Sequence, residues 1–297
     1  MLYGEVMPKQ LEALEKSGKF ISSCKVDGDN FQAVCKELNG KKNIRLINRH
    51  ENDYTEQFPE IVAGLGVKAN CILNGEIAYW NEEKQIYDFN IFRGRQGLQN
   101  ILEIKRRRLM FPCKFYVFDL ISYEGESMVN NPAFPFERRY RILKQIINDN
   151  NTTELLPIRQ DLKQHFKEEC EAGREGIVIK NINNIYCNER TRTAFKIKNW
   201  QYELVRFNGF EENQNDTITL TNGNDRVLCP SQKHIEEIRA TIMQLGWTEE
   251  VVRHLQDRSK ESGKCREPSW KPKEKYIKLC NTTSSKKNEI IQQGGLK

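Results

Sequence analysis

The sequence predicts an α+β protein, with a mixed and mainly antiparallel domain over residues 1–201 and an all-β barrel over residues 202–280. Two observations support this division. Short apolar runs alternate with helical periods through the first two-thirds of the chain, which is typical of a mixed domain of sheet and helix. Several short strand-like runs with a single helical period follow Trp200, which is typical of a small barrel.

In the first domain, helices are expected where apolar residues recur at helical spacing, as Leu11 and Leu14 do. These helices are expected over residues 9–18, 98–109 and 136–148. Strands are expected where apolar residues alternate or run together between turn signals. They are expected over residues 20–31 around Asp27-Gly28, 43–49, 71–79 with a break at Asn74-Gly75, 115–120, 176–179 and 194–197.

The second domain is expected to contain shorter strands and one helix. The strands are expected over residues 203–207, 217–220 and 226–229, with a turn at residues 222–225 joining the last two. Ser231 is expected to cap a helix that ends at Leu245 and carries an apolar stripe. Together these elements predict a five-stranded barrel of the oligonucleotide-binding (OB) type. The polar tail over residues 281–297 is expected to be flexible.

Positive charge is concentrated in two segments of a chain whose net charge is only +6. Residues 258–278 hold eight basic and three acidic side chains, and residues 105–108 are consecutive lysine and arginine. Such segments suit a polyanion, because each phosphate that they neutralise releases a condensed counterion. A solvated lysine face is the alternative interpretation of either segment taken alone.

The nine cysteines are scattered along the chain, and no pair has Cys-x-x-Cys spacing. No Cys/His cluster in the sequence indicates zinc, so reduced and partly buried thiols are expected. No signal peptide is apparent, and no apolar run approaches the ~20 residues that cross a bilayer. We therefore expect a cytoplasmic protein with no membrane partner.

The strongest chemical signal is Lys25, which lies two residues before the Asp27-Gly28 turn. This pattern is common by chance, and alone it indicates a surface turn. Because a free lysine has a pKa of ~10.4, a nucleophilic Lys25 would need burial or nearby cations to lower that pKa. Lys196 and Lys198 occupy alternate positions of a strand, so both can point toward one site and supply such cations. A solvent-facing strand edge would explain the same alternation.

Further motifs follow Lys25 in a definite order. They are Asn48-Arg49-His50, Asn74-Gly75-Glu76, the run from Phe115 to Leu120 that contains Phe118, the segment from Glu175 to Lys180, and Phe195-Lys196-Ile197-Lys198. In this order and spacing they resemble the nucleotidyltransferase motifs of ATP-dependent DNA ligases. Residues 49–61, 87–95 and 252–270 also resemble segments of that family, so the likeness covers roughly residues 8–275.

The resemblance implies a nucleotidyltransferase domain (the ATP-grasp-like ligase adenylation domain) followed by an all-β OB-fold domain. It implies that Lys25 carries an adenylate while 5′-phosphate/3′-hydroxyl nicks in duplex DNA are sealed, as in DNA repair, replication and recombination. ATP and Mg²⁺ are the implied cofactors, and nicked duplex DNA is the implied partner. The implied roles are catalysis for Lys25, Lys196 and Lys198; nucleotide contacts for Arg49, Glu76, Phe118, Lys196 and Lys198; metal binding for Glu76 and Glu175; and nucleic-acid contacts for Arg95, Arg266 and Lys271.

Departures from the family pattern leave alternatives open. Asn30 stands where DNA ligases usually have Arg, and the Asn30-Phe31 pair is similar to RNA-joining ligases. An RNA ligase is therefore an alternative, as are an mRNA-capping guanylyltransferase and a catalytically silent nucleic-acid clamp. The closing motif is reduced to residues 271–275, which leaves the efficiency of self-adenylylation open. Few residues precede Lys25, so a small monomeric form without an N-terminal DNA-binding domain is expected.

Overall fold

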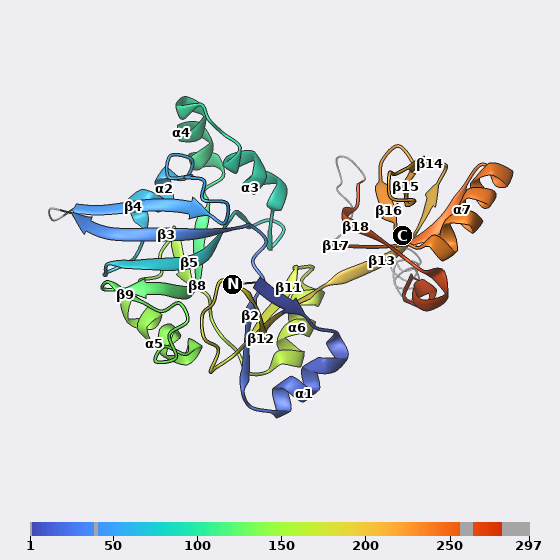
Figure 1. The fold of residues 1–297 in the computed structure, drawn as a ribbon. Helices are drawn as coiled ribbons and strands as arrows, with labels where there is room; N and C mark the ends of the chain where they lie inside the picture. The colour runs from blue at the N-terminus through green and yellow to red at the C-terminus, as the bar shows by residue number, and fades with distance from the viewer. Residues whose placement is uncertain (1, 39–40, 256–263, 281–297) are drawn as a thin grey trace, which may run out of the picture. The chain divides into compact units, whose positions relative to one another are not determined.

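The computed structural model describes residues 2–38, 41–255 and 264–280 (Figure 1). The chain divides into two compact units, residues 1–198 and 199–297. The tail predicted over residues 281–297 lies outside the described residues, as do residues 258–263 of the basic segment. Within the described ranges, no helix combines the length and the apolar character needed to cross a membrane.

Two sheets form the framework of the first unit. The six-stranded sheet contains, in spatial order, β10 (Thr153–Leu155), β8 (Lys114–Tyr123), β5 (Cys71–Ala78), β3 (Asp29–Leu38) and β4 (Lys41–Asn48), with β9 (Glu126–Ser127) paired to β8. The four-stranded sheet contains β1 (Leu2–Glu5), β12 (Arg190–Lys198), β11 (Gly176–Asn181) and β2 (Phe20–Cys24). Neighbouring strands are antiparallel except β1 with β12 and β10 with β8, so the predicted mixed α+β character is confirmed.

Helices pack on both sheets of this unit (Figure 1). On the four-stranded sheet, α6 (Leu162–Glu171) packs against β11 and β2, and α1 (Leu11–Lys16) packs against α6 after a short 3₁₀ turn, η1 (Pro8–Gln10). On the six-stranded sheet, α5 (Phe136–Ile146) packs against β8 and α2 (Pro59–Gly64) against β4. Two further helices, α3 (Phe89–Gln96) and α4 (Ile101–Met110), pack on each other, and β6 (Trp80–Asn81) pairs with β7 (Ile86–Tyr87).

The predicted break at Asn74-Gly75 is wrong, because β5 runs without interruption from Cys71 to Ala78. The irregularity lies instead in its partner: Asn74 pairs with Asp119 and Gly75 with Val117, so Phe118 is the extra residue of a bulge in β8. A bulge leaves one residue outside the regular pairing and can turn its side chain away from the sheet's alternation. The bulge thus sets the direction of Phe118, which lines the cavity described below.

The second unit has two antiparallel three-stranded sheets and one long helix. The sheets are β13 (Trp200–Phe207), β17 (Thr248–Leu255) and β18 (Arg266–Lys271), and β14 (Gly209–Glu212), β15 (Ile218–Thr221) and β16 (Arg226–Cys229). The helix α7 (Gln232–Leu245) buries Ile235, Ile238 and Ile242 in the core that these strands share. Ser231 does precede α7, but its hydroxyl contacts the ring Nδ1 of His234 at 2.6 Å, and no side-chain cap forms there.

Candidate active site

A cavity of about 690 Å³ opens in the first unit, and side chains from both of its sheets line it. Five of the residues singled out from the sequence are among its lining residues: Lys25, Arg49, Glu76, Phe118 and Lys196. They come from segments far apart in the chain, so their meeting is a property of the fold and not of local sequence. Glu175 and Lys198 are not among the lining residues, but Glu175 contacts Lys25 and Lys198 contacts Glu175.

Close backbone packing holds the Lys25 turn in place. The Lys25 N–H donates to the carbonyl of Gly176 at 2.8 Å, directly after β2 ends at Cys24. A Cβ on Gly28 would lie 2.0 Å from the carbonyl oxygen of Ile77, and a Cβ on Gly176 would lie 2.1 Å from that of Ile197. Gly176 also has φ +129°, a conformation that side-chain-bearing residues rarely adopt. Glycine is therefore required at both positions for the turn to approach β5 and β12.

The Lys25 ammonium belongs to an ionic cluster in which its own side chain is 20% exposed and that of Glu175 is 3% exposed. Its Nζ donates to Oε2 of Glu175 at 2.7 Å, and Nζ of Lys198 lies 3.2 Å from the other oxygen, Oε1. Burial lowers the pKa of Lys25, but the carboxylates of Glu175 and Glu76 outweigh it, and the net shift is upward. This differs from the lowered pKa expected from the sequence. The reason is that a carboxylate, not a second lysine, is the direct partner of the amine.

Lys196 has the opposite electrostatic setting. Burial, Lys198 and Lys25 together lower its pKa, in that order of importance. Lys196 and Lys198 lie opposite Val178 and Gly176 in the β11–β12 pairing, so the predicted alternation on one strand is present. Lys25 and Lys196 therefore line the cavity, and behind Lys25 the carboxylate of Glu175 lies between the amines of Lys25 and Lys198.

The pKa of the Glu76 carboxyl group is shifted by burial and by its charged neighbours. Its pKa is raised to about 8, mainly by burial and also by the acids Glu175, Asp29 and Asp27, although the Lys25 ammonium acts in the opposite direction. At neutral pH this group is thus close to its titration point. A positive charge placed among these acids would favour the ionised form of Glu76.

Phe118 rests on a polar cluster that the sequence did not reveal. The Lys180 Nζ lies 5.0 Å from the centre of the Phe118 ring and donates to Asp119 Oδ2 at 2.9 Å. Arg139 donates to the other oxygen of Asp119 at 2.7 Å, and all three charged groups are buried. Burial alone would raise the pKa of Asp119, but Lys180 and Arg139 hold it at about 2. In the sequence, Lys180 is marked only by its position at the end of the apolar run that follows Glu175.

Asn30 takes part in a relay of hydrogen bonds along the cavity wall. Its Nδ2 donates to Oδ1 of Asn74 and to the carbonyl of Gly75, both at 3.0 Å. The Asn74 Nδ2 donates in turn to the hydroxyl of Tyr186 at 3.1 Å. All of Asn30, Asn74 and Tyr186 line the cavity, and Tyr186 is the member of this relay that the sequence did not indicate.

Arg95 corrects one prediction. It was expected to contact a DNA phosphate, but its side chain is completely buried, with an exposed fraction of 0%. Its guanidinium donates to Glu60 at 2.6 Å and to the carbonyl of Gln57 at 3.2 Å. A guanidinium enclosed between α2 and α3 cannot reach a phosphate in solvent, so Arg95 is a structural ion-pair partner.

The remaining predicted contacts are at less enclosed positions. Arg49 is exposed at the end of β4, and its Nε lies 3.2 Å from Nε2 of His50, which also lines the cavity. Arg266 and Lys271 are half-buried at the first and last positions of β18 in the second unit. Their expected contacts with nucleic acid stay predictions.

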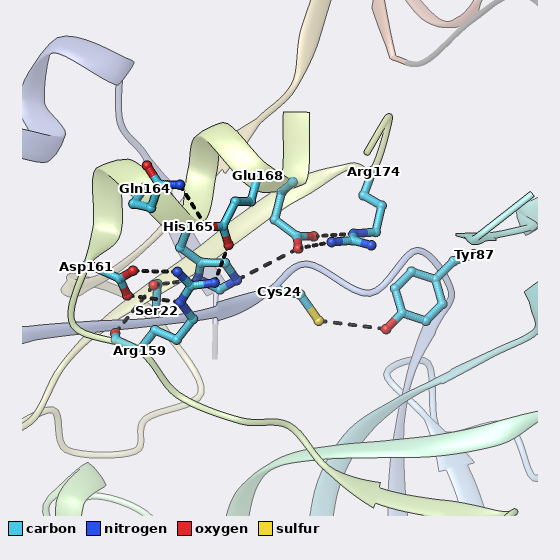
Figure 2. A network of polar contacts seen from close by, with 10 residues as sticks. Ser22, Cys24, Tyr87, Arg159, Asp161, Gln164, His165, Glu168 and Arg174 are labelled. Carbon is cyan, nitrogen blue, oxygen red and sulfur yellow. Dashed lines mark hydrogen bonds and ion pairs between the residues drawn. The ribbon is translucent and has the colours of Figure 1, made fainter. Parts of the chain in front are cut away.

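A polar network fixes the opposite face of the strand that leads to Lys25 (Figure 2). The Ser22 hydroxyl and His165 Nδ1 are 2.8 Å apart, and the Arg159 main chain pairs with that of Ser22. Next to His165, Arg174 donates to the Glu169 carboxylate at 2.7 and 3.0 Å. Ser22 and His165 are buried, at 0% and 5% exposure, so this Ser-His-Glu set has no access to a substrate. It ties β2 to α6 and so positions the Lys25 turn.

Residues 3–198 match the ATP dependent DNA ligase domain family, which is more than half of the chain. The chain belongs to the ATP-dependent DNA ligase family. A probable DNA ligase of Dictyoglomus turgidum is 30% identical over 195 residues, covering 63% of this chain and 32% of the relative. DNA ligase 1 of Methanosarcina mazei is 29% identical over 234 residues, covering 71% of this chain and 37% of the relative. The chain thus spans about a third of the length of these ligases.

The fold of the chain is also that of a ligase of known structure. A Lig E DNA ligase superposes with a TM-score of 0.61 at 15% identity, covering 91% of this chain and 97% of that one. At this identity the likeness concerns the fold. It adds to the family membership an architecture shared over nearly the whole length of both chains.

The polar network that contains Ser22 and His165 makes the free energy of unfolding depend on pH. Burial lowers the pKa of His165 below the ~6.5 of an unfolded chain, so the folded state favours the neutral ring. As pH falls through ~6.5, the unfolded chain takes up a proton that the folded chain resists, and stability declines by at most about 1.4 kcal/mol per pH unit. We predict that His165→Gln loses less thermal stability than the wild type between about pH 7.5 and about pH 5.5.

Differential scanning calorimetry at both pH values measures this effect, with His50→Gln, a change at an exposed histidine, as the control. An equal fall in the melting temperature of His165→Gln and of the wild type would contradict the role given to His165.

Proposed function

We propose that this chain is an ATP-dependent DNA ligase that seals 5′-phosphate/3′-hydroxyl nicks in duplex DNA through an adenylate on Lys25. The observation that carries the proposal is the position of the Lys25 amine, which lies at the wall of a cavity and 2.7 Å from Glu175. Glu76, Phe118 and Lys196 line the same cavity. Family membership supports the same reaction. A nucleotide would be the substrate that this set of aromatic, cationic and acidic groups can hold.

The proposed nucleotide lies with its adenine on Phe118. Aromatic rings stack well on bases, and the Lys180 cluster beneath Phe118 keeps that ring from moving. Arg49 and Glu76 would contact the ribose, and Lys196 and Lys198 the phosphates. Cationic side chains at the phosphates offset the charge of the nucleotide and help to stabilise the transition state of phosphoryl transfer.

Lys25 is the proposed nucleophile. Its nitrogen forms a bond to the α-phosphorus as the bond from that phosphorus to the pyrophosphate oxygen breaks, and the amine gives up its proton. The Glu175 contact must weaken first, because it stabilises the ammonium form. Burial and the neighbouring Lys196 then both lower the Lys25 pKa. The AMP passes to the 5′-phosphate of the nick, and attack by the 3′-hydroxyl releases AMP and joins the strand.

The acidic residues of the site fit a magnesium ion. Mg²⁺ prefers carboxylate oxygens, and the carboxyl group of Glu76 lies near those of Glu175, Asp29 and Asp27, which contribute to its raised pKa after the larger effect of burial. Glu76 and Glu175 would hold the ion. When bound, Mg²⁺ neutralises charge that develops on the phosphates.

Two surfaces are proposed to hold the DNA backbone. On α4, the side chains of Lys105 and Arg106 are exposed beside each other. In the second unit, Arg266 and Lys271 lie on β18. We propose that this unit is an OB-fold barrel, which its two three-stranded sheets and single long helix support.

An RNA strand is the second candidate substrate, and Asn30 is the observation that favours it. The Asn30 side chain lines the cavity, where DNA ligases usually have Arg. Sealing rates on matched nicked duplexes, one all DNA and one with an RNA 3′-strand, separate the two. Faster joining of the RNA strand would favour an RNA ligase; adduct formation from GTP instead of ATP would indicate a capping enzyme.

We predict that Lys25→Ala abolishes covalent attachment of labelled AMP, lowering adduct formation by at least ~10³-fold, because the variant has no amine at the α-phosphorus. Gel analysis of the chain after incubation with labelled ATP and Mg²⁺ measures the adduct. Lys9→Ala, which removes an exposed lysine, is the control and should keep full adduct formation. A wild-type chain that forms no adduct, but still binds nicks, would indicate the silent clamp.

We predict that Phe118→Ala raises the KM for ATP in adduct formation by about tenfold, because stacking on a base contributes ~1–3 kcal/mol. Phe118→Tyr keeps the ring and should stay near the wild-type KM. Equal KM values for Phe118→Ala and the wild type would show that the adenine lies elsewhere.

We predict that affinity for a nicked duplex falls steeply with salt, and that Lys105→Gln with Arg106→Gln reduces the log–log slope by up to about 2. Fluorescence anisotropy over a salt series measures the slope. Lys16→Gln, an exposed lysine on α1, is the control. An unchanged slope in the double variant would remove α4 from the DNA-contacting surface.

A further inference from the structure

Three potential metal ligands meet in the second unit. The carboxylate of Glu203, the imidazole of His254 and the thiol of Cys265 each offer a donor atom, and these atoms all lie within 4.8 Å of one another. The steps proposed for nucleotide transfer use none of the three. Spacing along the chain gives no sign of the cluster, because its members belong to three different strands or their ends.

The pairing of β13, β17 and β18 brings these residues together. Glu203 pairs with Val252, two residues before His254 on β17, so both side chains project from the same face of the sheet. On the other side of β17, Leu255 pairs with Arg266 after a shift of register, which places Cys265 beside the end of that strand. The irregular pairing thus moves the thiol next to the imidazole.

The distances suit a small divalent ion. Metal–ligand bonds of ~2.0–2.3 Å in a tetrahedral site put neighbouring ligand atoms about 3.3–3.8 Å apart. The His254 Nε2 and Glu203 Oε2 atoms are already 3.5 Å apart. The thiol lies within 4.8 Å of both, so all three donor atoms are close enough to one another to surround a single ion.

The burial of the cluster and the chemical types of its ligand atoms indicate which metal ion it would bind. The His254 side chain is 6% exposed and the Glu203 side chain 43%, so the cluster has a dry inner side and an opening to solvent. Thiolate and imidazole are ligands of zinc, whereas Mg²⁺ and Ca²⁺ take oxygen.

We propose that Glu203, His254 and Cys265 bind one Zn²⁺ ion, which links β13, β17 and the start of β18. An ion bound only by the folded chain stabilises it by mass action. The site is separate from the proposed Mg²⁺ site in the first unit, and it does not depend on ligase activity. Its role is to fasten the strands of the second unit to one another.

Cobalt substitution tests the proposal on the full chain, without ATP and with Mg²⁺ in excess. The chain is freed of metal with a chelator and titrated with Co²⁺, an optical probe for zinc sites. We expect one equivalent to give a thiolate-to-cobalt charge-transfer band and the intense visible bands of tetrahedral cobalt, and Zn²⁺ to displace it. In Cys265→Ser the charge-transfer band should disappear. In His254→Gln and Glu203→Gln the affinity should fall at least tenfold.

Cys187→Ser is the matched control, because Cys187 is a half-buried cysteine of the first unit. It should keep the cobalt spectrum of the wild type. Circular dichroism checks that each variant is folded, and Glu203→Gln changes a partly exposed side chain, so at least one test survives if a buried variant unfolds. Zinc should also raise the melting temperature of the wild type and leave that of Cys265→Ser unchanged.

No charge-transfer band in the wild type at one equivalent of Co²⁺ would overturn the proposal. So would an unchanged spectrum in Cys265→Ser. Adduct formation with labelled ATP is a separate readout of the first unit, so failure of the zinc site and failure of the ligase assignment can be told apart.

Discussion

The ion pair between the partly buried Lys25 and the buried Glu175 is the interaction on which the rest of the site depends. Removing a charge from water costs several kcal/mol unless a partner compensates it, so each group requires the other. Lys25 follows the end of β2, Glu175 precedes β11, and Lys198 is the last residue of β12. Because β11 is antiparallel to both neighbours, its start lies beside their ends. The sheet therefore assembles the three charges at one edge.

A second buried cluster supports the opposite wall of the cavity. Asp119 on β8, Arg139 on α5 and Lys180 on β11 connect the two sheets of the first unit through charges that are almost completely enclosed. Loss of one member would leave an uncompensated buried charge, so the cluster strongly favours one arrangement of these elements. The proposed reaction needs the Phe118 ring and the Lys25 amine at fixed positions. The ring contacts Lys180 of this cluster, and the amine is held by Glu175.

Much of this site could be predicted from the sequence because the order and spacing of its motifs resemble those of the ligase family, although each motif alone is a weak signal. Lys25, Glu76 and Lys196 were identified in this way, and they line one cavity. The roles of Lys180 and Tyr186 were not, because their contacts with Asp119 and Asn74 join segments that are distant in the chain.

The helices α3 and α6 show why other elements escaped prediction. The buried face of α3 includes Arg95 and Gln96, and that of α6 includes His165 and Glu169. Polar residues on an inward face interrupt the apolar period that marks a helix. The contact of Arg95 with DNA was implied by the family resemblance, and nothing in the sequence indicated that Glu60 of another helix neutralises this arginine. Such contacts become visible only when the helices are packed.

The most direct test of the central claim is to locate the nucleotide on the chain. The protein would be incubated with ATP and Mg²⁺, digested, and its peptides sequenced by mass spectrometry. We predict that AMP is attached to the peptide that contains Lys25, through a phosphoramidate bond to its side-chain nitrogen. AMP attached to Lys196, Lys198 or any other residue would contradict the assignment of Lys25 as the nucleophile.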